Sequence, residues 1–221
     1  MPLPMPLAHV ESFESGPLGC MCSIIADLQA KTAIVVDPGG DAEYINERLT
    51  ALGCTLVQVI HTHTHFDHVG ATPELQSAHK CICAIHEADR FLYDLLPVQA
   101  AMFGMGTPAR AEMDGSLVDG RPVAVGAHEL DVMHVPGHTP GSVAFFLPAG
   151  GPKGEPIVFA GDTLFQGSVG RTDLWGGDTN ALLTSVKKRL FTLPDNAIVV
   201  PGHGPLTSIG VEKRTNPFVR S

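Results

Sequence analysis

Residues 61–68 read His-Thr-His-Thr-His-Phe-Asp-His, which places four histidines and one aspartate within eight positions. Imidazole nitrogen and carboxylate oxygen are preferred ligands of metals such as zinc and iron. The run directly follows residues 55–60, whose apolar and β-branched side chains are typical of a buried strand. The sequence therefore predicts a metal-binding loop at the end of a core strand, where a rigid scaffold presents reactive groups.

Three later loops repeat the same order of an apolar strand, a glycine and one metal-binding side chain. The strand candidates at 128–135, 156–160 and 196–200 are followed by Gly137-His138, Gly161-Asp162 and Gly202-His203. Glycine carries no side chain, so it lets the backbone approach a metal closely. Together with the first loop, these positions offer enough ligands for two metal ions that share one carboxylate.

The composition is that of a globular chain without a nucleic-acid surface. The 221 residues are 44% hydrophobic and carry a formal net charge of −9, and an acidic balance argues against nucleic acid as a partner. No apolar run is long enough to cross a bilayer, and the proline-rich start lacks the basic region of a signal peptide. We therefore expect a single domain over residues 1–221 that is cytoplasmic and binds no membrane.

The five cysteines have two interpretations. Cys20 and Cys22, and likewise Cys81 and Cys83, are two positions apart within strand candidates. They could form a four-cysteine zinc site, but the members of a ligand pair are usually separated by about two to four residues. Since free cysteine packs as a small hydrophobe, we interpret all five, including Cys54, as core thiols.

Apolar periodicity divides the chain into two halves of similar organisation. The strands predicted in the first half are 7–13, 20–27, 32–37, 55–60 and 81–85. Its predicted helices are 42–52, 72–79, 87–95 and 98–105, before a loop over 106–115. In the second half, strands are predicted at 122–125, 128–135, 142–147, 156–160 and 196–200, and a helix at 178–191. Such halves indicate two packed sheets with helices outside.

The histidine-rich run can be read in two registers, and only one of them contains a complete motif. His63-x-His65-x-Asp67-His68 has two spaced histidines followed by Asp-His, and it resembles the signature of the metallo-β-lactamase superfamily. The Pro-Gly-His, Gly-Asp and Gly-His loops match the remaining motifs of that superfamily in order. The resemblance spans essentially the whole chain. It implies an α+β fold, an αββα sandwich of two packed mixed β-sheets with helices on the outer faces.

The resemblance also implies the ligands of two divalent metal ions with a bridging water or hydroxide. The ligands would be His63, His65 and His138 for the first ion, and Asp67, His68 and His203 for the second. Asp162 would bridge the two ions, and Asp67 and Asp162 are the expected catalytic residues. Zinc is the expected metal, with iron or manganese as alternatives, because this ligand set accepts several metals. His61 precedes the motif, and we interpret it as a supporting or packed residue.

Local segments narrow the resemblance to the glyoxalase II branch, the hydroxyacylglutathione hydrolases. The segments 37–43, 161–165, 170–173 and 201–205 are similar to that branch, and most of all to its short, single-domain, YcbL-like bacterial type. The resemblance implies hydrolysis of a thioester such as S-lactoylglutathione. Longer glyoxalases II hold glutathione with a C-terminal helical domain, whereas this chain ends about 18 residues after His203.

Arg171 is the expected substrate-binding residue. It stands where the longer enzymes have a lysine that contacts glutathione, and Asp173 stands where they have a tyrosine. A guanidinium group pairs well with a substrate carboxylate, but a structural ion pair between Arg171 and Asp173 is an equal alternative. Lys213 and Arg214 are interpreted as part of a solvated tail.

Other functions remain as alternatives. Residues 170–173 also resemble the persulfide dioxygenases of the superfamily, which use a single iron, although the complete second ligand set with His203 favours a hydrolase. A lactonase is a further alternative because activated water attacks lactones and thioesters alike. The acidic charge disfavours a nuclease, and the intact ligand set disfavours a non-catalytic scaffold. We expect a small-molecule thioester as partner, with glutathione derivatives as candidates, and a monomer or weak homo-oligomer.

Overall fold

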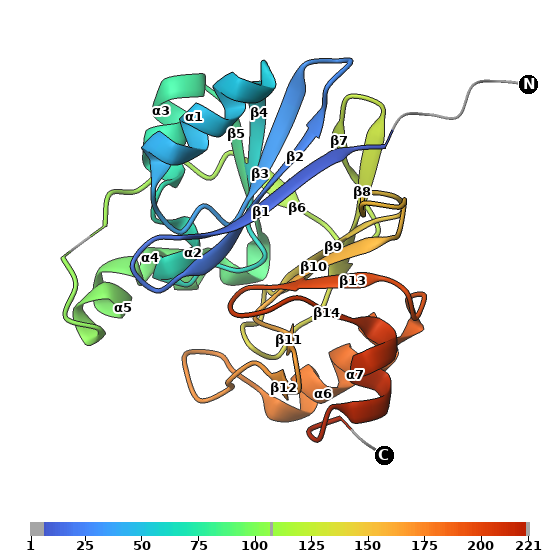
Figure 1. Cartoon of the computed structure of the whole chain (residues 1–221). Coiled ribbons are helices and arrows are strands. Elements are labelled where there is room, and N and C mark those ends of the chain that lie inside the picture. Colours follow the sequence, from blue (N-terminus) through green and yellow to red (C-terminus); the bar gives the residue numbers. More distant parts are fainter. Residues whose placement is uncertain (1–6, 107, 220–221) are drawn as a thin grey trace, which may run out of the picture.

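Two six-stranded sheets pack face to face in the computed structural model, which describes residues 7–106 and 108–219 (Figure 1). The strand order is β1-β2-β3-β4-β5-β6 in the first sheet and β14-β13-β10-β9-β8-β7 in the second. Both sheets are mixed, since each contains antiparallel and parallel neighbours. A two-stranded ribbon, β11 (Leu164–Phe165) with β12 (Ser168–Val169), is separate from both.

The first sheet comes from the N-terminal half of the chain. Its strands are β1 (His9–Ser15), β2 (Cys20–Asp27), β3 (Thr32–Val36), β4 (Thr55–Ile60), β5 (Ile82–His86) and β6 (Gly115–Leu117). The parallel pairs β3–β4 and β4–β5 need crossover connections. The helix at Ala42–Leu52 provides the first connection, and the helix at Thr72–His79 lies in the second. The helices of this half are α1 (Ala42–Leu52), α2 (Phe66–Val69), α3 (Thr72–His79), α4 (Arg90–Asp94) and α5 (Leu96–Met102), with a 3-10 turn at Glu87–Asp89.

The second sheet comes from the C-terminal half. Its strands are β7 (Val123–Val125), β8 (His128–His134), β9 (Val143–Leu147), β10 (Ile157–Gly161), β13 (Ile198–Pro201) and β14 (Thr207–Ser208). Its helices are α6 (Thr179–Lys188) and α7 (Ile209–Thr215), with a 3-10 turn at Leu190–Thr192. Within the described residues, no helix combines the length and the apolar character needed to span a membrane.

Three buried clusters show that the layers are helix, sheet, sheet and helix. Successive residues of a strand point to opposite faces of a sheet. Ile24 of β2 therefore packs in the cluster under α1, whereas its neighbour Ile25 packs between the two sheets. In β10, Phe159 joins the cluster between the sheets, and Val158 packs in the cluster with Val186 of α6. This arrangement confirms the predicted αββα sandwich.

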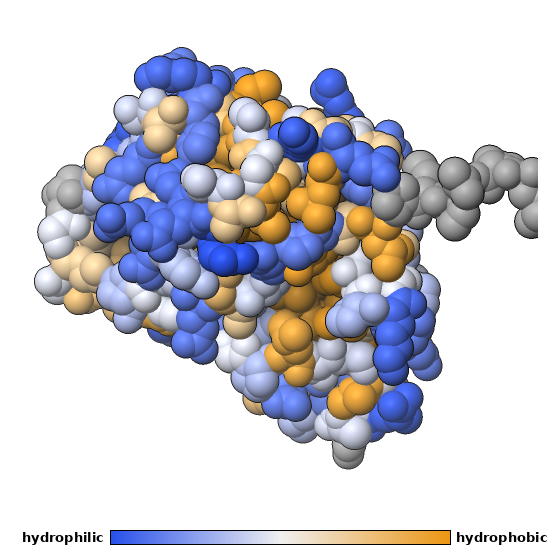
Figure 2. Space-filling model, turned by 45° about the horizontal axis from the view of Figure 1, so that its top comes forward, coloured by the Kyte–Doolittle hydropathy of each residue, from blue (hydrophilic) through white to orange (hydrophobic). Residues whose placement is uncertain are grey.

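The edges of the two sheets meet on one face, where apolar side chains remain at the surface. A hollow there is bordered by β1 on one side and by β13 and the turn at 150–152 on the other. Leu7 and Leu206 line it and are each about half exposed. Hydrophobic residues gather on this face, between largely hydrophilic regions (Figure 2).

The structure differs from the sequence prediction at short or terminal elements. β1 begins two residues later than predicted, and the segment predicted as a loop over 106–115 leads into the edge strand β6. The residues after His203 do not form a solvated tail. They form β14 and α7, because Ser208 caps the helix N-terminus and Ile209 is fully buried. Lys213 Nζ lies 2.6 Å from Asp195 Oδ1, away from the predicted metal site.

Candidate metal centre

The predicted ligand loops meet at one edge of the paired sheets. The histidine-rich run follows β4, Gly161-Asp162 lies at the end of β10, and His203 follows β13. His138 lies on the turn between β8 and β9. The short helix α2 begins within the histidine-rich run, at Phe66, and carries the Asp-His part of the motif. All seven predicted ligands therefore come from four strand ends, and the structure brings six of them together in two groups, with Asp162 between the groups.

The first group consists of His63, His65 and His138, all buried. His138 Nε2 lies 3.2 Å from His63 Nε2 and 2.9 Å from His65 Nδ1. Nitrogens that bind one zinc ion tetrahedrally at about 2.0–2.1 Å lie about 3.3 Å from one another. The spacing of these three nitrogens therefore fits a single divalent ion.

The second group consists of Asp67, His68 and His203. Asp67 Oδ2 lies 3.2 Å from His203 Nε2 and 3.9 Å from His68 Nε2. Burial alone would raise the pKa of Asp67, but the neighbouring His68 and His203 hold that pKa below its usual value. An ionised carboxylate with two imidazoles is a suitable ligand set for zinc, iron or manganese.

Asp162 lies between the two groups and faces both. Its Oδ2 is 3.6 Å from His138 Nε2, whereas its Oδ1 is 3.5 Å from His68 Nε2 and 3.9 Å from His203 Nε2. Asp162 Oδ1 and His68 Nε2 are buried and have no hydrogen-bond partner within 7–106 and 108–219. Buried polar atoms normally have a partner, so these two atoms fit coordination to a metal.

A glycine makes this close approach possible. A Cβ atom at Gly202 would lie 2.0 Å from Asp162 Oδ1 and 2.9 Å from His68 Cε1. Any side chain at this position would therefore displace the carboxylate. The glycine that precedes His203 in the sequence is a requirement of the site.

Hydrogen bonds to the far side of three rings leave their Nε2 atoms free to bind metal. His138 Nδ1 donates to the carbonyl oxygen of Arg171 at 2.8 Å, and His68 Nδ1 donates to Asp37 Oδ2 at 3.0 Å. His63 Nδ1 donates to Thr62 Oγ1 at 3.1 Å, since that hydroxyl gives its own proton to Asp37. Burial, followed by the neighbouring imidazoles, lowers the pKa of His63, so its ring is neutral and can coordinate.

Asp37 is a residue of the site that the motifs did not identify. Its carboxylate accepts hydrogen bonds from Thr62 N at 2.7 Å, from Thr62 Oγ1 at 2.5 Å and from His68 Nδ1. Asp37 lies close enough to His63 and His68 to form a further metal-binding group. Because three donors already occupy its oxygens, we interpret it as a support of His68. Its signal in the sequence is its place directly after β3, the parallel neighbour of β4.

The remaining histidines and the cysteines lie outside these groups. His61 is fully buried, and its Nε2 atom is 3.3 Å from Thr72 Oγ1. Burial lowers the pKa of His61 to about 4, so it packs as a neutral ring at the strand end. The five cysteines are free and buried, as the core-thiol interpretation predicts. Within the described part of the chain, the metal-binding groups contain none of His9, His79, His86, His128, His134 or the cysteines.

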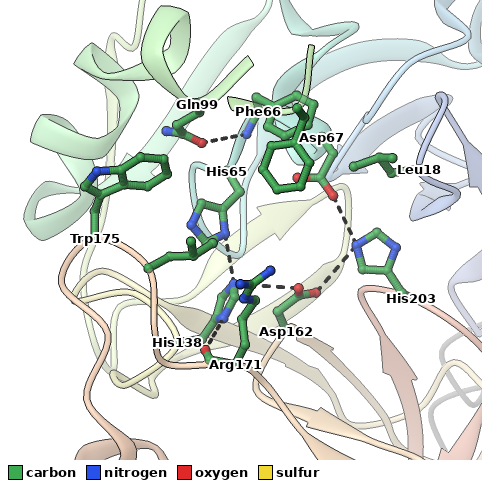
Figure 3. A pocket seen from close by; sticks show the side chains of 12 residues that line it. Leu18, His65, Phe66, Asp67, Gln99, His138, Asp162, Arg171, Trp175 and His203 are labelled. Atoms are coloured by element: carbon green, nitrogen blue, oxygen red, sulfur yellow. Dashed lines mark hydrogen bonds and ion pairs between the residues drawn. The ribbon is translucent and has the colours of Figure 1, made fainter. Parts of the chain in front are cut away.

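A pocket of about 280 Å³ opens directly onto the two groups. Its floor is formed by predicted ligands, and its walls are largely apolar (Figure 3). The ligands that line it are His65, Asp67, His138, Asp162 and His203. The other lining residues are Leu18, Phe66, Gln99, Phe103, Arg171, Leu174 and Trp175. A small organic molecule with an apolar part fits such a pocket.

Arg171 lies at the pocket and also makes the ion pair with Asp173 that the sequence offered as an alternative. It lines the pocket, and its guanidinium group makes a bidentate ion pair with Asp173, at 2.7 Å from Nε and 2.8 Å from Nη2. Both side chains are more than half exposed. The pair is therefore screened by solvent and contributes little to stability.

The chain belongs to the metallo-beta-lactamase superfamily, whose sequence model matches residues 15–203. It is similar to the hydroxyacylglutathione hydrolase GloC of Haemophilus influenzae, with 38% identity over 90% of this chain and 92% of that protein. Among solved structures, it is similar to the B3 metallo-beta-lactamase BLEG-1, with 33% identity, a TM-score of 0.86 and coverage of 96% and 100%. It is also similar to TTHA1623 in a di-iron-bound form, with 36% identity, a TM-score of 0.81 and coverage of 94% and 99%.

Proposed function

We propose that this protein is a two-metal hydrolase that cleaves thioesters such as S-lactoylglutathione. The position of Asp162 carries the proposal, because its two carboxylate oxygens face the two metal-binding groups separately. One shared carboxylate between two ligand sets is the arrangement that a bridged pair of ions requires. The similarity to GloC, which is named a hydroxyacylglutathione hydrolase, supports the choice of substrate.

The metal ligands in this proposal are the six residues of the two groups and Asp162, which lies between them. His63, His65 and His138 would hold one divalent ion, Asp67, His68 and His203 would hold the other, and Asp162 would be shared between them. Zinc is the expected ion, with iron or manganese as alternatives. When bound, the two ions supply Lewis-acid chemistry that activates water for attack on a carbonyl carbon.

The protein's own residues orient the substrate and keep bulk water away. Phe66, Leu174 and Trp175 form an apolar wall beside the polar floor of the pocket, and one arm of the thioester packs against it. Asp67, which stays ionised, places a negative charge at the floor. The leaving group is a thiolate, and since a free thiol has a pKa of about 8.5, it departs without a dedicated general acid.

Arg171 is the proposed contact for a substrate carboxylate. Its exposed ion pair with Asp173 is weak, so a carboxylate of a glutathione derivative can replace Asp173 at the guanidinium group. The planar guanidinium fork binds a carboxylate with two parallel hydrogen bonds. Arg171 therefore bears on substrate choice and not on the activation of water.

The experiment compares substrates on protein loaded with zinc, iron or manganese. Loss of thioester absorbance with S-lactoylglutathione is measured beside hydrolysis of a lactone and of a chromogenic β-lactam. The β-lactam is included because of the similarity to BLEG-1. Thioester turnover should exceed the other two activities, and a preference for the lactone or the β-lactam would contradict the proposal.

The persulfide dioxygenase reading is tested in the same preparation. Oxygen consumption is followed with glutathione persulfide, and the metal content is measured on the purified protein. The proposal expects thioester cleavage without oxygen uptake and close to two ions per chain. Oxygen uptake with a single iron per chain would establish the dioxygenase instead.

A further inference from the structure

Asp89 is a fully buried carboxylate beside the metal centre that belongs to none of the metal-binding groups within the described ranges. It lies in the 3-10 turn that follows β5. Its Oδ2 accepts hydrogen bonds from Thr139 Oγ1 at 2.8 Å and from Thr64 N at 3.1 Å, and its Oδ1 accepts from Gly141 N at 2.6 Å. Its carbonyl oxygen also accepts from Thr64 Oγ1 at 3.1 Å.

These partners belong to two loops that carry the three-histidine group. Thr64 stands between His63 and His65 in the sequence, and Thr139 directly follows His138. The loops are more than 70 residues apart along the chain, and His138 Nε2 meets both other nitrogens across them. Asp89 is thus hydrogen-bonded to both loops. The geometry of the three-histidine group depends on the distance between these two loops.

The contact between Asp89 and Gly141 has little room to adjust. A Cβ atom at Gly141 would lie 2.6 Å from the Asp89 backbone nitrogen and carboxylate carbon. Burial raises the pKa of Asp89, while the three donors on its carboxylate oppose that rise. An acceptor with two oxygens is needed here, because backbone N–H groups approach from both sides.

We propose that Asp89 is a positioning residue that fixes the distance between the two loops and so sets the metal affinity of the three-histidine group alone. Groups that orient metal ligands without touching the metal typically change metal affinity by about 10- to 100-fold when they are altered. Asp89 makes no hydrogen bond to the loop that carries His203, whose group is supported through Asp37. The two halves of the centre therefore have different direct supports, and Asp37 reaches the three-histidine group only through the Thr62 hydroxyl.

The test substitutes Asp89→Asn in two single-site proteins. His203→Ala leaves the three-histidine group, and His138→Ala leaves the group with Asp67 and His68. The amide is nearly the same size as the carboxylate, but in either orientation its nitrogen faces a backbone N–H, of Thr64 or of Gly141. The dissociation constant for zinc is measured in each protein by competition with a chromogenic chelator.

Asp27→Asn is the matched control. Asp27 is also a buried carboxylate, and it accepts hydrogen bonds from three backbone N–H groups, of Gln29, Ala30 and Ala127. It lies at the far end of β2, which pairs with the beginning of β3, away from the ligand loops. A general loss of stability would affect both variants, whereas a positioning role affects only Asp89→Asn.

We expect Asp89→Asn to weaken zinc binding about 10- to 100-fold in the His203→Ala protein. In the His138→Ala protein, Asp89→Asn should change the dissociation constant for zinc by no more than about twofold, as expected for a distant site. Asp27→Asn should likewise change it by no more than about twofold in both single-site proteins. Equal losses in both single-site proteins, or no loss in the first, would overturn the proposal. Thr139→Val, which removes one of the three donors, gives a second measurement if Asp89→Asn does not fold, with an expected loss of about two- to tenfold.

The inference rests on the proposed metal centre, and the experiment separates their failures. Zinc affinity is measured without any substrate, so an error in the proposed reaction leaves the result intact. Absence of zinc binding in the His203→Ala protein itself would contradict the three-histidine site. Tight binding that Asp89→Asn leaves unchanged would contradict only the positioning role.

Discussion

The two ligand groups of the metal centre differ in the type of their ligands and in their exposure to solvent. The three-histidine group offers three imidazole nitrogens, and its members are at most 6% exposed. The other group includes a carboxylate, Asp67, and the side chain of His203 is 30% exposed. A buried ligand set favours firm retention of one ion, whereas a more exposed set favours exchange with solvent and contact with substrate. We therefore expect the two groups to differ in how firmly they hold an ion.

The largest effect is expected where the two halves join. Asp162→Ala removes the carboxylate that faces both groups, so it should lower kcat/KM for the thioester by more than the roughly 100-fold typical of outer supports. Far-ultraviolet circular dichroism should remain unchanged, because the side chain contributes nothing to the three buried clusters. Retention of activity in the folded variant would contradict the bridged centre.

Disruption of one ligand group should leave the other group able to bind its metal ion. His203→Ala should reduce the metal content from about two ions per chain to about one, as measured by elemental analysis after extensive dialysis. During treatment of the unsubstituted protein with a chelator, one ion should be lost well before the second, since His203 is the most exposed ligand. Simultaneous loss of both ions would remove the distinction between the halves.

A smaller effect is expected when Asp37, the residue that supports His68, is substituted. Asp37→Asn weakens the acceptor of the His68 Nδ1 proton, and it should weaken zinc binding by about 10- to 100-fold in the protein that carries His138→Ala. The effect on the three-histidine group should be smaller, because Asp37 reaches His63 only through the Thr62 hydroxyl. A larger loss in the His203→Ala protein would reverse this assignment.

The smallest effect lies at the rim of the pocket, outside both halves. Asp173→Asn releases Arg171 from an exposed ion pair worth at most about 1 kcal/mol. The KM for S-lactoylglutathione should therefore fall by up to about fivefold, while the KM for an uncharged thioester and the metal content stay the same. Asp119→Asn is the control, because it breaks a similar exposed pair with Arg189. An equal fall in KM for both substrates would argue against Arg171 as the carboxylate contact.

Local signals explain why much of the fold was predictable. The bounds predicted for β2, α1, β4 and α3 agree with the structure. α1 ends at Gly53, whose φ of 64° is the left-handed conformation that terminates helices. The close approach of the seven predicted ligands was also foreseeable, because each follows a strand within a short motif. Each of these features depends on neighbours in the sequence.

Contacts between distant segments explain what the sequence did not reveal. β6 and β14 have only three and two residues, and each exists because it pairs with the edge of a sheet already formed. Asp37 and Asp89 lie in turns whose sequences do not reveal their hydrogen-bond partners, and these main partners are 25 to 52 residues away. The interpretation of Lys213 and Arg214 as part of a solvated tail was wrong for the same reason, since Ile209 of the same helix is buried only when the second sheet is present.

Neighbouring positions 170 and 171 differ sharply in what they tolerate. A Cβ atom at Gly170 would lie 1.8 Å from the carbonyl oxygen of Asp162 and 3.3 Å from His138 Cβ. At the next position, only the main-chain carbonyl of Arg171 supports His138, and the side chain points into the pocket opening. Mutation at position 171 can therefore alter which compounds enter without disturbing the ligand that the same residue holds. A single substitution at position 171 can therefore change the substrate range of such proteins, while the arrangement of the predicted metal ligands stays the same.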